Sequence, residues 1–476
     1  MALAGLFALA FAVRSLHAAD IAPVLDTPRQ PGLQMTRRYD VQAVDMLYGD
    51  GILFPSVLDP QDTGLLSRPP GYALVLAALY RAVGRDLATT QLVQNLLCSL
   101  TAPLLLLLGA EIFSFRAGLV AGALVAVAPH FAWYSNWIVP DALCVIAVVA
   151  ALLLSWRGLR PGRSLLWQAA AGASLGAGVW LRPNLLLAGV ALGLGILATR
   201  PRARGLRQAA VLCGVSLLAV LPITARNYVV FGRFVPVSIN LGIVLWEGIA
   251  DAGGERFGAV RTDPEVERQE ARLYGDPRYR DWWAAPDGIQ RDHDRVSRSL
   301  AVIRENPAWF ARAAVARMAR MLDYAGEAPP FVGRFDAPGV AAQTNARRSE
   351  RWNAPGRTRG LEPRLPAWIA RAPGELLAPL RPAVACAQAV LSEVLTVAVL
   401  LGVLLIGLAA PRRSAFLGSL PLSLLVLQSP LHFEFRVTLA LHAVLFVFAS
   451  CGLVLLGAGL KALFAARRLS RHARAA

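Results

Sequence analysis

The residues best suited to chemistry in this sequence lie where polar segments meet long apolar runs. A carboxylate in such a position can accept a proton from a hydroxyl group or orient that group. A fixed arginine can bind a phosphate or stabilise negative charge as a bond breaks. The candidate carboxylates are Asp141, which follows Pro140 at the start of an apolar run, and Asp40. The other candidate site residues are Tyr39, Arg68, Tyr72, Arg182, Arg226 and Arg436.

Each candidate also has an ordinary structural interpretation. Asp141 could cap the helix that it begins, because aspartate is a strong capping residue at helix N-termini. Asp40 could be a solvated charge on an amphipathic helix, and the arginines could face lipid headgroups. Arg436 could pair with Glu434 and simply stabilise a helix end. The sequence leaves these alternatives open.

The composition predicts an all-α integral membrane protein. The chain has 476 residues, of which 56% are apolar and 17% charged, with a mean hydropathy of +0.49. A water-soluble protein of this length would carry more charge. Apolar runs recur that are long enough to cross the hydrocarbon core, which gives about ten candidate spans in a polytopic helical bundle. These are residues 2–17, 88–110, 117–134, 141–157, 165–181, 184–199, 206–225, 383–409, 415–431 and 437–460.

The net charge of +17 is distributed as in a membrane protein. Arginines gather in the short links between apolar runs and in the C-terminal tail, a pattern typical of cytoplasmic loops. We therefore predict contact with a lipid bilayer and no binding of nucleic acid. The arginine clusters are Arg157, Arg160 and Arg163; Arg200, Arg202, Arg204 and Arg207; Arg412 and Arg413; and Arg467, Arg468, Arg471 and Arg474.

Placing all of these clusters in the cytoplasm fixes the expected topology. Residues 70–84 must then lie along the outer interface as a short helix, beside another helix at 35–48, because an additional span there would turn the clusters outward. Residues 2–17 have no positive charge ahead of them, so we expect a retained span rather than a cleaved signal peptide. The expected regions are an N-terminal membrane module (1–225) with an outer-face loop (18–87), an outer-face region (226–382), and C-terminal membrane helices with a basic cytoplasmic tail (383–476).

The outer-face region 226–382 divides into two halves. Apolar residues recur at helical spacing within 263–325, which predicts helices that break at Asn306-Pro307. Residues 326–378 are rich in Pro, Gly and Arg and have little periodicity, so we expect irregular structure there.

The cysteines do not indicate a disulfide framework or a metal site. The five cysteines all lie in apolar runs, and their spacing matches no metal-binding motif. The sequence therefore predicts no metal ligands.

Several segments, taken together and in this order, resemble the GT-C superfamily of integral membrane glycosyltransferases. The resemblance is strongest to the branch that contains protein O-mannosyltransferases (glycosyltransferase family 39) and the lipid A aminoarabinose transferase. The segments are Tyr39-Asp40-x-x-Ala43 with Gly49-x-Gly51, then Arg68-Pro69-Pro70-Gly71-Tyr72, Pro140-Asp141-Ala142, Leu181-Arg182-Pro183-Asn184, and Arg226-Asn227-Tyr228. A weaker match surrounds His432 and Arg436.

The resemblance implies transfer of a sugar from a polyprenyl-phosphate donor to an acceptor at the outer face of the inner (plasma) membrane. The acceptor could be a glycolipid, a polysaccharide precursor or a protein. In this interpretation Asp141 is the main catalytic carboxylate and Asp40 assists it, while Arg68 is the leading ligand of the donor phosphate. Tyr39, Tyr72, Arg182, Arg226 and Arg436 complete the expected substrate site. No cofactor is certain, and a divalent metal ion remains an option.

The sequence departs from this family at one important position. Relatives carry an acidic residue four positions before the tyrosine that matches Tyr39, and here that position is Met35. Ala440 also replaces a proline that relatives often show after their last arginine. Two other classes therefore stay open, a transporter or flippase for a lipid-linked sugar and a non-catalytic protein of envelope assembly. A transporter is disfavoured because we find no two-fold repeat and few charges in mid-span.

Overall fold

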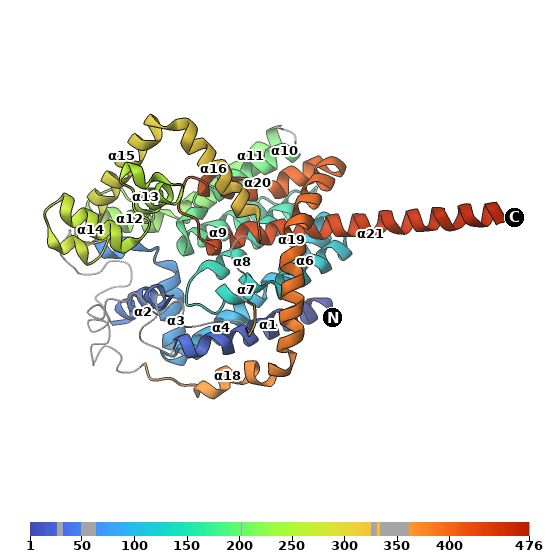
Figure 1. Cartoon of the computed structure of the whole chain (residues 1–476), viewed down its shortest axis with the longest axis horizontal. Helices are drawn as coiled ribbons and strands as arrows, with labels where there is room; N and C mark the ends of the chain where they lie inside the picture. Colours follow the sequence, from blue (N-terminus) through green and yellow to red (C-terminus); the bar gives the residue numbers. More distant parts are fainter. Residues whose placement is uncertain (26–31, 49–62, 201, 325–330, 334–360, 476) are drawn as a thin grey trace.

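The computed structural model describes residues 1–25, 32–48, 63–200, 202–324, 331–333 and 361–475, and these residues form helices and turns without a β-strand. The all-α fold expected from the composition is therefore confirmed (Figure 1). The bundle helices are α1 (Ala2–Leu25), α4 (Leu87–Ser99), α5 (Thr101–Ile112), α6 (Phe115–Val127), α7 (Pro129–Tyr134), α8 (Asp141–Gly158), α9 (Leu166–Leu181), α10 (Ala188–Thr199), α11 (Arg202–Leu218), α12 (Leu221–Phe231), α19 (Arg381–Ala409), α20 (Pro411–Gln428) and α21 (Leu439–Ala475). The shorter flanking helices are α2 (Gly32–Tyr48), α3 (Gly71–Val83), α13 (Leu241–Asp251), α14 (Asp263–Leu273), α15 (Gly288–Glu305), α16 (Pro307–Leu322) and α18 (Ala367–Leu376).

Six segments within the described residues are long and apolar enough to cross a membrane. They are Ala2–Ala22, Leu87–Ile112, Asp141–Gly158, Ala203–Phe231, Ala367–Ala409 and Phe435–Ala458, and three shorter apolar helices accompany them at Gly71–Val83, Phe115–Val127 and Pro183–Thr199. The multi-pass architecture is confirmed, while the number of about ten spans stays a prediction.

Two of these segments form the centre of the bundle. The most apolar stretches of Asp141–Gly158 and Phe435–Ala458 are 67% and 78% buried inside the protein, against 28–56% for the other four segments. A polar residue at the end of a central helix meets neighbouring helices before it meets lipid. Asp141 and Arg436, at the ends of these two segments, are therefore placed to meet inside the protein.

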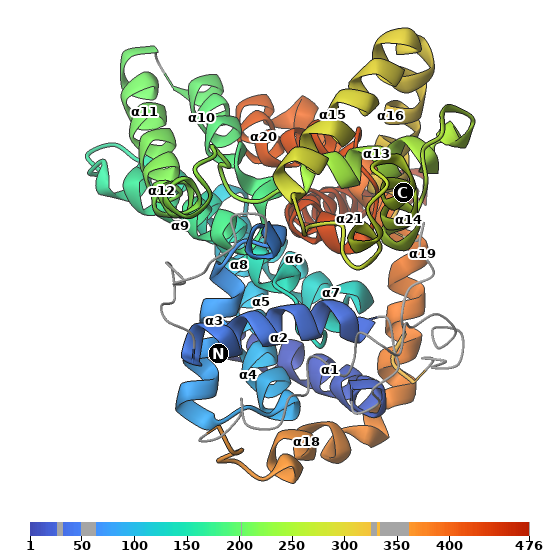
Figure 2. The same cartoon turned by 90° about the vertical axis from the view of Figure 1, so that its left-hand side faces the viewer.

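Two elements that carry candidate residues, α2 and α12, lie at one end of the molecule. In Figure 1 the two chain ends lie on the right, and α2, α12, α13 and α14 lie on the left. Figure 2 looks at that left-hand end, with α1, α4 and α18 in the lower half and α10, α11, α15, α16 and α20 in the upper half.

Helices α13 to α16 build a small layer at this end. The prediction of helices within 263–325 is confirmed, and the break falls at the expected place because α15 ends at Glu305 and α16 begins at Pro307. A proline has no backbone N–H to donate and is tolerated only in the first turn of a helix.

The expectation of irregular structure throughout 326–378 is wrong for α18. This helix packs against α1, and a Cβ atom at Gly374 would lie 2.5 Å from the carbonyl oxygen of Ser15. A tertiary contact with a distant helix therefore stabilises a segment whose own pattern is weak. The greater part of the remainder, residues 334–360, lies outside the described residues.

The layer of α13 to α16 is held together by a buried charge cluster. Glu270 in α14 is fully buried and accepts hydrogen bonds from Arg291 at 2.7 Å and from Arg295 at 2.6 and 2.7 Å. Both arginines belong to α15, and each also donates to backbone carbonyls of the intervening loop. One carboxylate thus fixes α14 onto α15 through two guanidinium groups that water does not reach.

We predict that Glu270→Gln strongly destabilises the protein, because it leaves two buried guanidinium groups without a counter-charge. Breaking a buried ion pair from one side costs about 3–5 kcal/mol. The matched control is Asp276→Asn, since Asp276 pairs with the exposed Arg278 in the same layer, and an exposed pair contributes only about 0–1 kcal/mol. The unfolding temperature of the purified protein in detergent should decrease strongly for Glu270→Gln and stay nearly unchanged for Asp276→Asn. Equal unfolding temperatures for the two variants would contradict this view of the layer.

Candidate functional site

Arg68 follows a short 3-10 helix that is hydrogen-bonded to the layer of α13 to α16. This element, η1 (Thr63–Ser67), is joined to the layer through Thr63. The Thr63 hydroxyl donates to the carbonyl of Ala284 at 2.6 Å and accepts from the backbone N–H of Gly288 at 2.7 Å. The segment that carries Arg68 is therefore fixed by contacts more than 200 residues away in the sequence.

The next residues bring Arg68 to the end of α9. A Cβ atom at Gly71, the first residue of α3, would overlap the backbone carbonyl of Trp180 near the end of α9. Only glycine allows this close approach of two backbones. The contact places Arg68 beside Arg182, which follows α9 directly, and the charge of Arg182 acts on Arg68.

Asp141 and Arg182 form an ion pair at the head of α8. Asp141 is the first residue of α8 and is 3% exposed, and Arg182 donates a hydrogen bond to its carboxylate. Burial alone would lower the pKa of Arg182, and the charge and hydrogen bond of Asp141 raise it above its ordinary value. Arg182 therefore stays charged, and the ion pair holds the two side chains in place.

Arg436 brings a third guanidinium group to the same place. It pairs with Glu434 in the turn before α21, and its charge acts on Arg68 and is in turn influenced by Arg182 and Asp141. Among the described residues, these three arginines and the two carboxylates that pair with Arg182 and Arg436 carry one net positive charge. Burial lowers the pKa of Arg68, and the charges of Arg182 and Arg436 lower it further, while Tyr39 and Asp263 oppose this shift. A bound anion would neutralise the net positive charge and stabilise the site.

Tyr39 lies at the side of this arginine cluster. Its hydroxyl group is buried, has no hydrogen-bond partner among the described residues, and acts electrostatically on both Arg68 and Arg182. Its ring meets that of Tyr72 edge to face, with ring centroids 5.0 Å apart. The structure thus brings together Tyr39, Arg68, Asp141, Arg182 and Arg436, with Tyr72 directly behind them.

A network of buried amides positions these residues, and the sequence analysis did not identify it. The Tyr72 hydroxyl donates to Gln94 in α4 at 2.5 Å, and Gln94 donates in turn to the carbonyls of Ser135 and Trp137, each at 2.7 Å. This links α3 through α4 to the loop that leads into Asp141. The available signal was three amides, Gln91, Gln94 and Asn95, at helical spacing within an apolar run.

Asp40 faces away from the arginine cluster. Its carboxylate accepts two hydrogen bonds from Arg85 and one at 2.8 Å from the Tyr80 hydroxyl. Adjacent residues of a helix point about 100° apart, so the side chains of Tyr39 and Asp40 contact different groups. The arrangement gives Asp40 a structural task in joining α2 to α3, and its catalytic role stays a prediction.

Arg226 also stands apart. It lies in α12, is 4% exposed, and has no ion-pair partner among the described residues. No electrostatic interaction links Arg226 to the charged groups of the arginine cluster. Its role in binding substrate stays a prediction, separate from that of Arg68, Arg182 and Arg436.

Two expected features of the first loop lie outside the described part. Gly49 and Gly51 are among the residues that the structure does not describe, and the same holds for the side chain of Met35, which lies in α2. Within the described residues, no three histidine, cysteine or acidic side chains are arranged to bind a metal ion. The option of a divalent metal ion stays a prediction.

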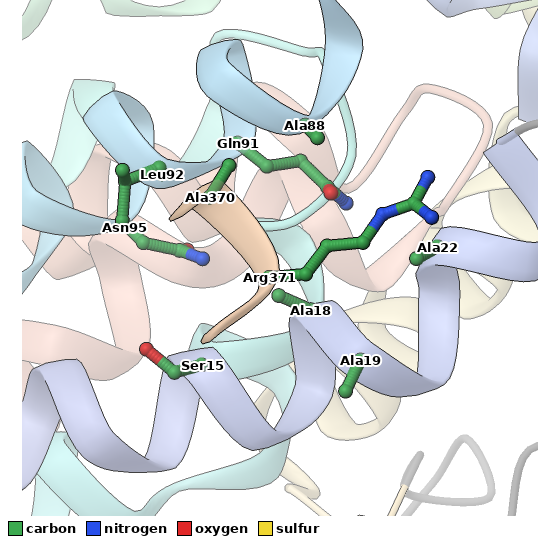
Figure 3. Close-up of a pocket in the computed structure, with 10 residues that line it drawn as sticks. All are labelled: Ser15, Ala18, Ala19, Ala22, Ala88, Gln91, Leu92, Asn95, Ala370 and Arg371. Atoms are coloured by element: carbon green, nitrogen blue, oxygen red, sulfur yellow. The ribbon is translucent and has the colours of Figure 1, made fainter. Parts of the chain in front are cut away.

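A small cavity behind the amide network is not the substrate site. It lies between α1, α4 and α18, where its lining includes Gln91, Asn95 and Arg371 (Figure 3). Its volume of about 20 Å³ is close to the space of one water molecule. It is therefore too small for a sugar or a lipid phosphate.

Comparison with known proteins agrees with this geometry. A family model described as dolichyl-phosphate-mannose-protein mannosyltransferase matches residues 67–226, a range that includes Arg68, Asp141 and Arg182. No curated protein matches the chain in sequence. The apo oligosaccharyltransferase of Archaeoglobus fulgidus is similar in structure, with a TM-score of 0.51 and 13% identity over 98% of this chain and 52% of that one.

The same archaeal enzyme in complex with Zn and sulfate gives a TM-score of 0.50 and 13% identity over 97% of this chain and 49% of that one. The chain has the GT-C fold. It spans about half the length of these archaeal structures. ArnT from Cupriavidus metallidurans bound to undecaprenyl phosphate is 16% identical over 94% of this chain and 77% of that one, with a TM-score of 0.38. The resemblance to GT-C glycosyltransferases predicted from the motifs is confirmed by the family model and the fold.

The sequence analysis did not identify one buried acid near the arginine cluster. Glu247 in α13 is 7% exposed and lies near Glu434. Burial, together with the charges of Asp263, Glu434 and Asp251, raises its pKa to about 10. Only the fold brings these four acids together, and a single glutamate in the apolar segment 241–251 gave no readable pattern.

We predict that Gly71→Ala destabilises the protein by about 1–3 kcal/mol, the usual cost of forcing extra atoms into a packed contact. The added methyl group must push the start of α3 away from Trp180. The control is Gly214→Ala in α11, where a Cβ atom would meet nothing within 4 Å and the substitution should favour the helix. Thermal unfolding in detergent should separate the two variants. An unchanged unfolding temperature for Gly71→Ala would show that the α3–α9 contact is not tight.

Proposed function

We propose that this chain is a glycosyltransferase that moves a sugar from a polyprenyl-phosphate donor to an acceptor at the outer face of the inner or plasma membrane. The observation that carries the proposal is the cluster of Arg68, Arg182 and Arg436. Together with the paired carboxylates of Asp141 and Glu434, it has one net positive charge among the described residues, and it lies where α8 begins and α9 ends. A lipid phosphate anchored in the bilayer presents its charge near the ends of the membrane helices.

The cluster suits the departure of a phosphate group. During transfer the bond between C1 of the sugar and the phosphate oxygen breaks, and its electron pair stays on the phosphate. Fixed cations stabilise this charge without reorganising. Arg182 and Arg436 are held by Asp141 and Glu434, while Arg68 has no hydrogen-bonded carboxylate among the described residues. Arg68 is therefore the guanidinium with most to gain from the phosphate.

The family match supports the donor class. The description of the matching family model names a dolichyl-phosphate-mannose donor, and we propose a polyprenyl-phosphate sugar for this chain on that basis. The acceptor is proposed to be a hydroxyl group of a glycolipid, a polysaccharide precursor or a protein. In this proposal Asp141 orients Arg182 and stands close to the reacting atoms, and a catalytic role for it follows from the same geometry.

The arginine clusters support the outer-face location. The links at 157–163 and 200–207 lie between bundle helices, and the positive-inside rule puts such links in the cytoplasm. In Figure 1 both chain ends lie opposite the end that holds α2 and α13. If the chain ends are cytoplasmic, the candidate site is on the outer side.

The proposal predicts that purified protein binds undecaprenyl phosphate and that Arg68→Ala weakens this binding roughly ten- to hundredfold, as expected for loss of a charge-assisted hydrogen bond. The matched control is Arg163→Ala, which removes a positive charge from the link at 157–163. Binding is measured with the protein in nanodiscs of a neutral lipid. Equal affinities for wild type, Arg68→Ala and Arg163→Ala would show that the phosphate does not bind at this site. Tight binding without any sugar transfer would favour a flippase.

We also predict that positions in the link at 157–163 and in the α13–α16 layer face opposite sides of the membrane. Cysteines introduced as Arg160→Cys and Asp281→Cys, each at an exposed position, should react with a membrane-impermeant reagent from opposite sides. The background carries Cys386→Ser, since Cys386 is an exposed native cysteine. Labelling of both positions from the outside would overturn the proposed topology.

A further inference from the structure

Glu247 lies on the face of α13 that meets the turn carrying Glu434 and Arg436. The carbonyl of Val244 accepts a hydrogen bond from the backbone N–H of His432 at 2.7 Å, and Asp251 pairs with the His432 ring. A Cβ atom at Gly248 would lie 2.6 Å from the same backbone nitrogen. Residues 244, 248 and 251 share one helix face by their spacing, and Glu247 lies on it between them.

Glu247 is a buried acid that has no cationic partner among the described residues. Asp263 also has none there, but it is only partly buried. Asp141 pairs with Arg182, Asp40 with Arg85, Glu434 with Arg436 and Asp251 with His432. Among the described residues Glu247 has no hydrogen bond or ion pair, although it is 7% exposed. A buried carboxyl without a partner is costly, and such groups gather at functional sites.

The charges that surround Glu247 come from several elements. Asp251 lies on α13 itself, Asp263 on α14, Glu434 and His432 in the turn before α21, and Arg295 on α15. Burial and the three carboxylates raise the pKa of Glu247 to about 10, while Arg295 opposes them. The carboxyl is therefore protonated at neutral pH in the unliganded protein, and its ionised form is a strong base.

Two acids connect this carboxyl electrostatically with the arginine cluster. Glu434 joins the two, because its charge acts on Glu247 while its carboxylate pairs with Arg436. Asp263 joins them from the other side, because its charge acts on both Glu247 and Arg68. The site thus has a cationic side that suits the donor phosphate and an acidic side, on which Glu247 is the buried carboxyl without an ion pair among the described residues.

We propose that Glu247 accepts the proton of the acceptor hydroxyl during sugar transfer, an inference that rests on the proposed function. In this step the acceptor oxygen forms a bond to C1 of the sugar, and the bond from C1 to the phosphate oxygen breaks. The electron pair leaves with the prenyl phosphate, beside Arg68, Arg182 and Arg436. The hydroxyl proton passes to the ionised carboxylate of Glu247, which makes it a catalytic residue that the sequence motifs do not include.

The proposal distinguishes Glu247 from a structural residue through its stability. The folded-state pKa lies above the unfolded value, so the native fold loses stability as pH rises above the unfolded pKa. A neutral glutamine of the same shape removes this loss. Glu247→Gln should therefore unfold at the same or a higher temperature at neutral pH, whereas a structural residue would destabilise the fold when replaced.

The test uses the full-length chain in nanodiscs with undecaprenyl-phosphate-mannose as the donor, and it measures release of undecaprenyl phosphate. For Glu247→Gln we expect kcat to fall by about 10²–10⁴-fold, with the donor KM and the affinity for undecaprenyl phosphate unchanged. Glu247→Asp should restore part of the turnover. The same measurements on Asp141→Asn compare the two carboxylates directly.

A pH profile gives a second readout that does not require the Glu247 variant to fold. Turnover of wild type should increase as pH rises toward the pKa of Glu247. Asp263→Asn removes the carboxylate that raises this pKa most, so it should shift the profile to lower pH and increase turnover at neutral pH. The control is Asp281→Asn, an exposed aspartate of the same layer, which should leave the profile in place.

Each outcome decides the matter. Near-normal kcat in Glu247→Gln, or an unshifted profile in Asp263→Asn, would overturn the role of Glu247 and leave the proposed function standing. Absence of both undecaprenyl phosphate binding and donor turnover in wild type would overturn the proposed function and this inference with it.

Discussion

The ion pair between Asp141 and Arg182 is the interaction on which the site depends. It joins the start of α8, one of the two innermost segments, to the end of α9 at a depth where both groups are almost fully excluded from solvent. A lone charge in that position would be very costly, so each partner needs the other. The close approach of α3 to Trp180 then sets Arg68 beside this pair, and Arg436 arrives from the other central segment. The geometry of the cluster thus follows from helix packing that is not itself part of the chemistry.

The layer of α13 to α16 contributes to the site in the same indirect way. Glu270 fixes α14 onto α15, and this fixes the loop to which Thr63 is hydrogen-bonded. The layer also supplies α13, whose contact with the turn at His432 places Glu247 near Glu434, the partner of Arg436. Two independent modules of the chain therefore meet at the candidate site. The membrane bundle brings the positive charge, and the layer brings the unpaired acid.

The sequence analysis named the residues that form the arginine cluster, because each arginine lies at the end of an apolar run and helix ends on one face of a membrane must lie near one another. Arg68, Asp141, Arg182 and Arg436 are brought together for that reason. Their roles in binding stay predictions. Local pattern could not reveal what depends on distant contacts. The contacts of Asp40 with Arg85 and Tyr80 could not be predicted from the sequence. Glu247 had no motif, and α18 had too weak a period to be recognised without its packing against α1.

The central claim is that one prenyl phosphate binds at the guanidinium groups of Arg68, Arg182 and Arg436. The most direct measurement is an electron cryo-microscopy structure of the full-length protein in nanodiscs with undecaprenyl phosphate added. The account predicts that the phosphate lies within hydrogen-bonding distance of Arg68, between the pairs Asp141–Arg182 and Glu434–Arg436, with the prenyl chain passing into the bilayer. A phosphate bound at Arg226, with the three-arginine cluster unchanged and empty, would contradict it.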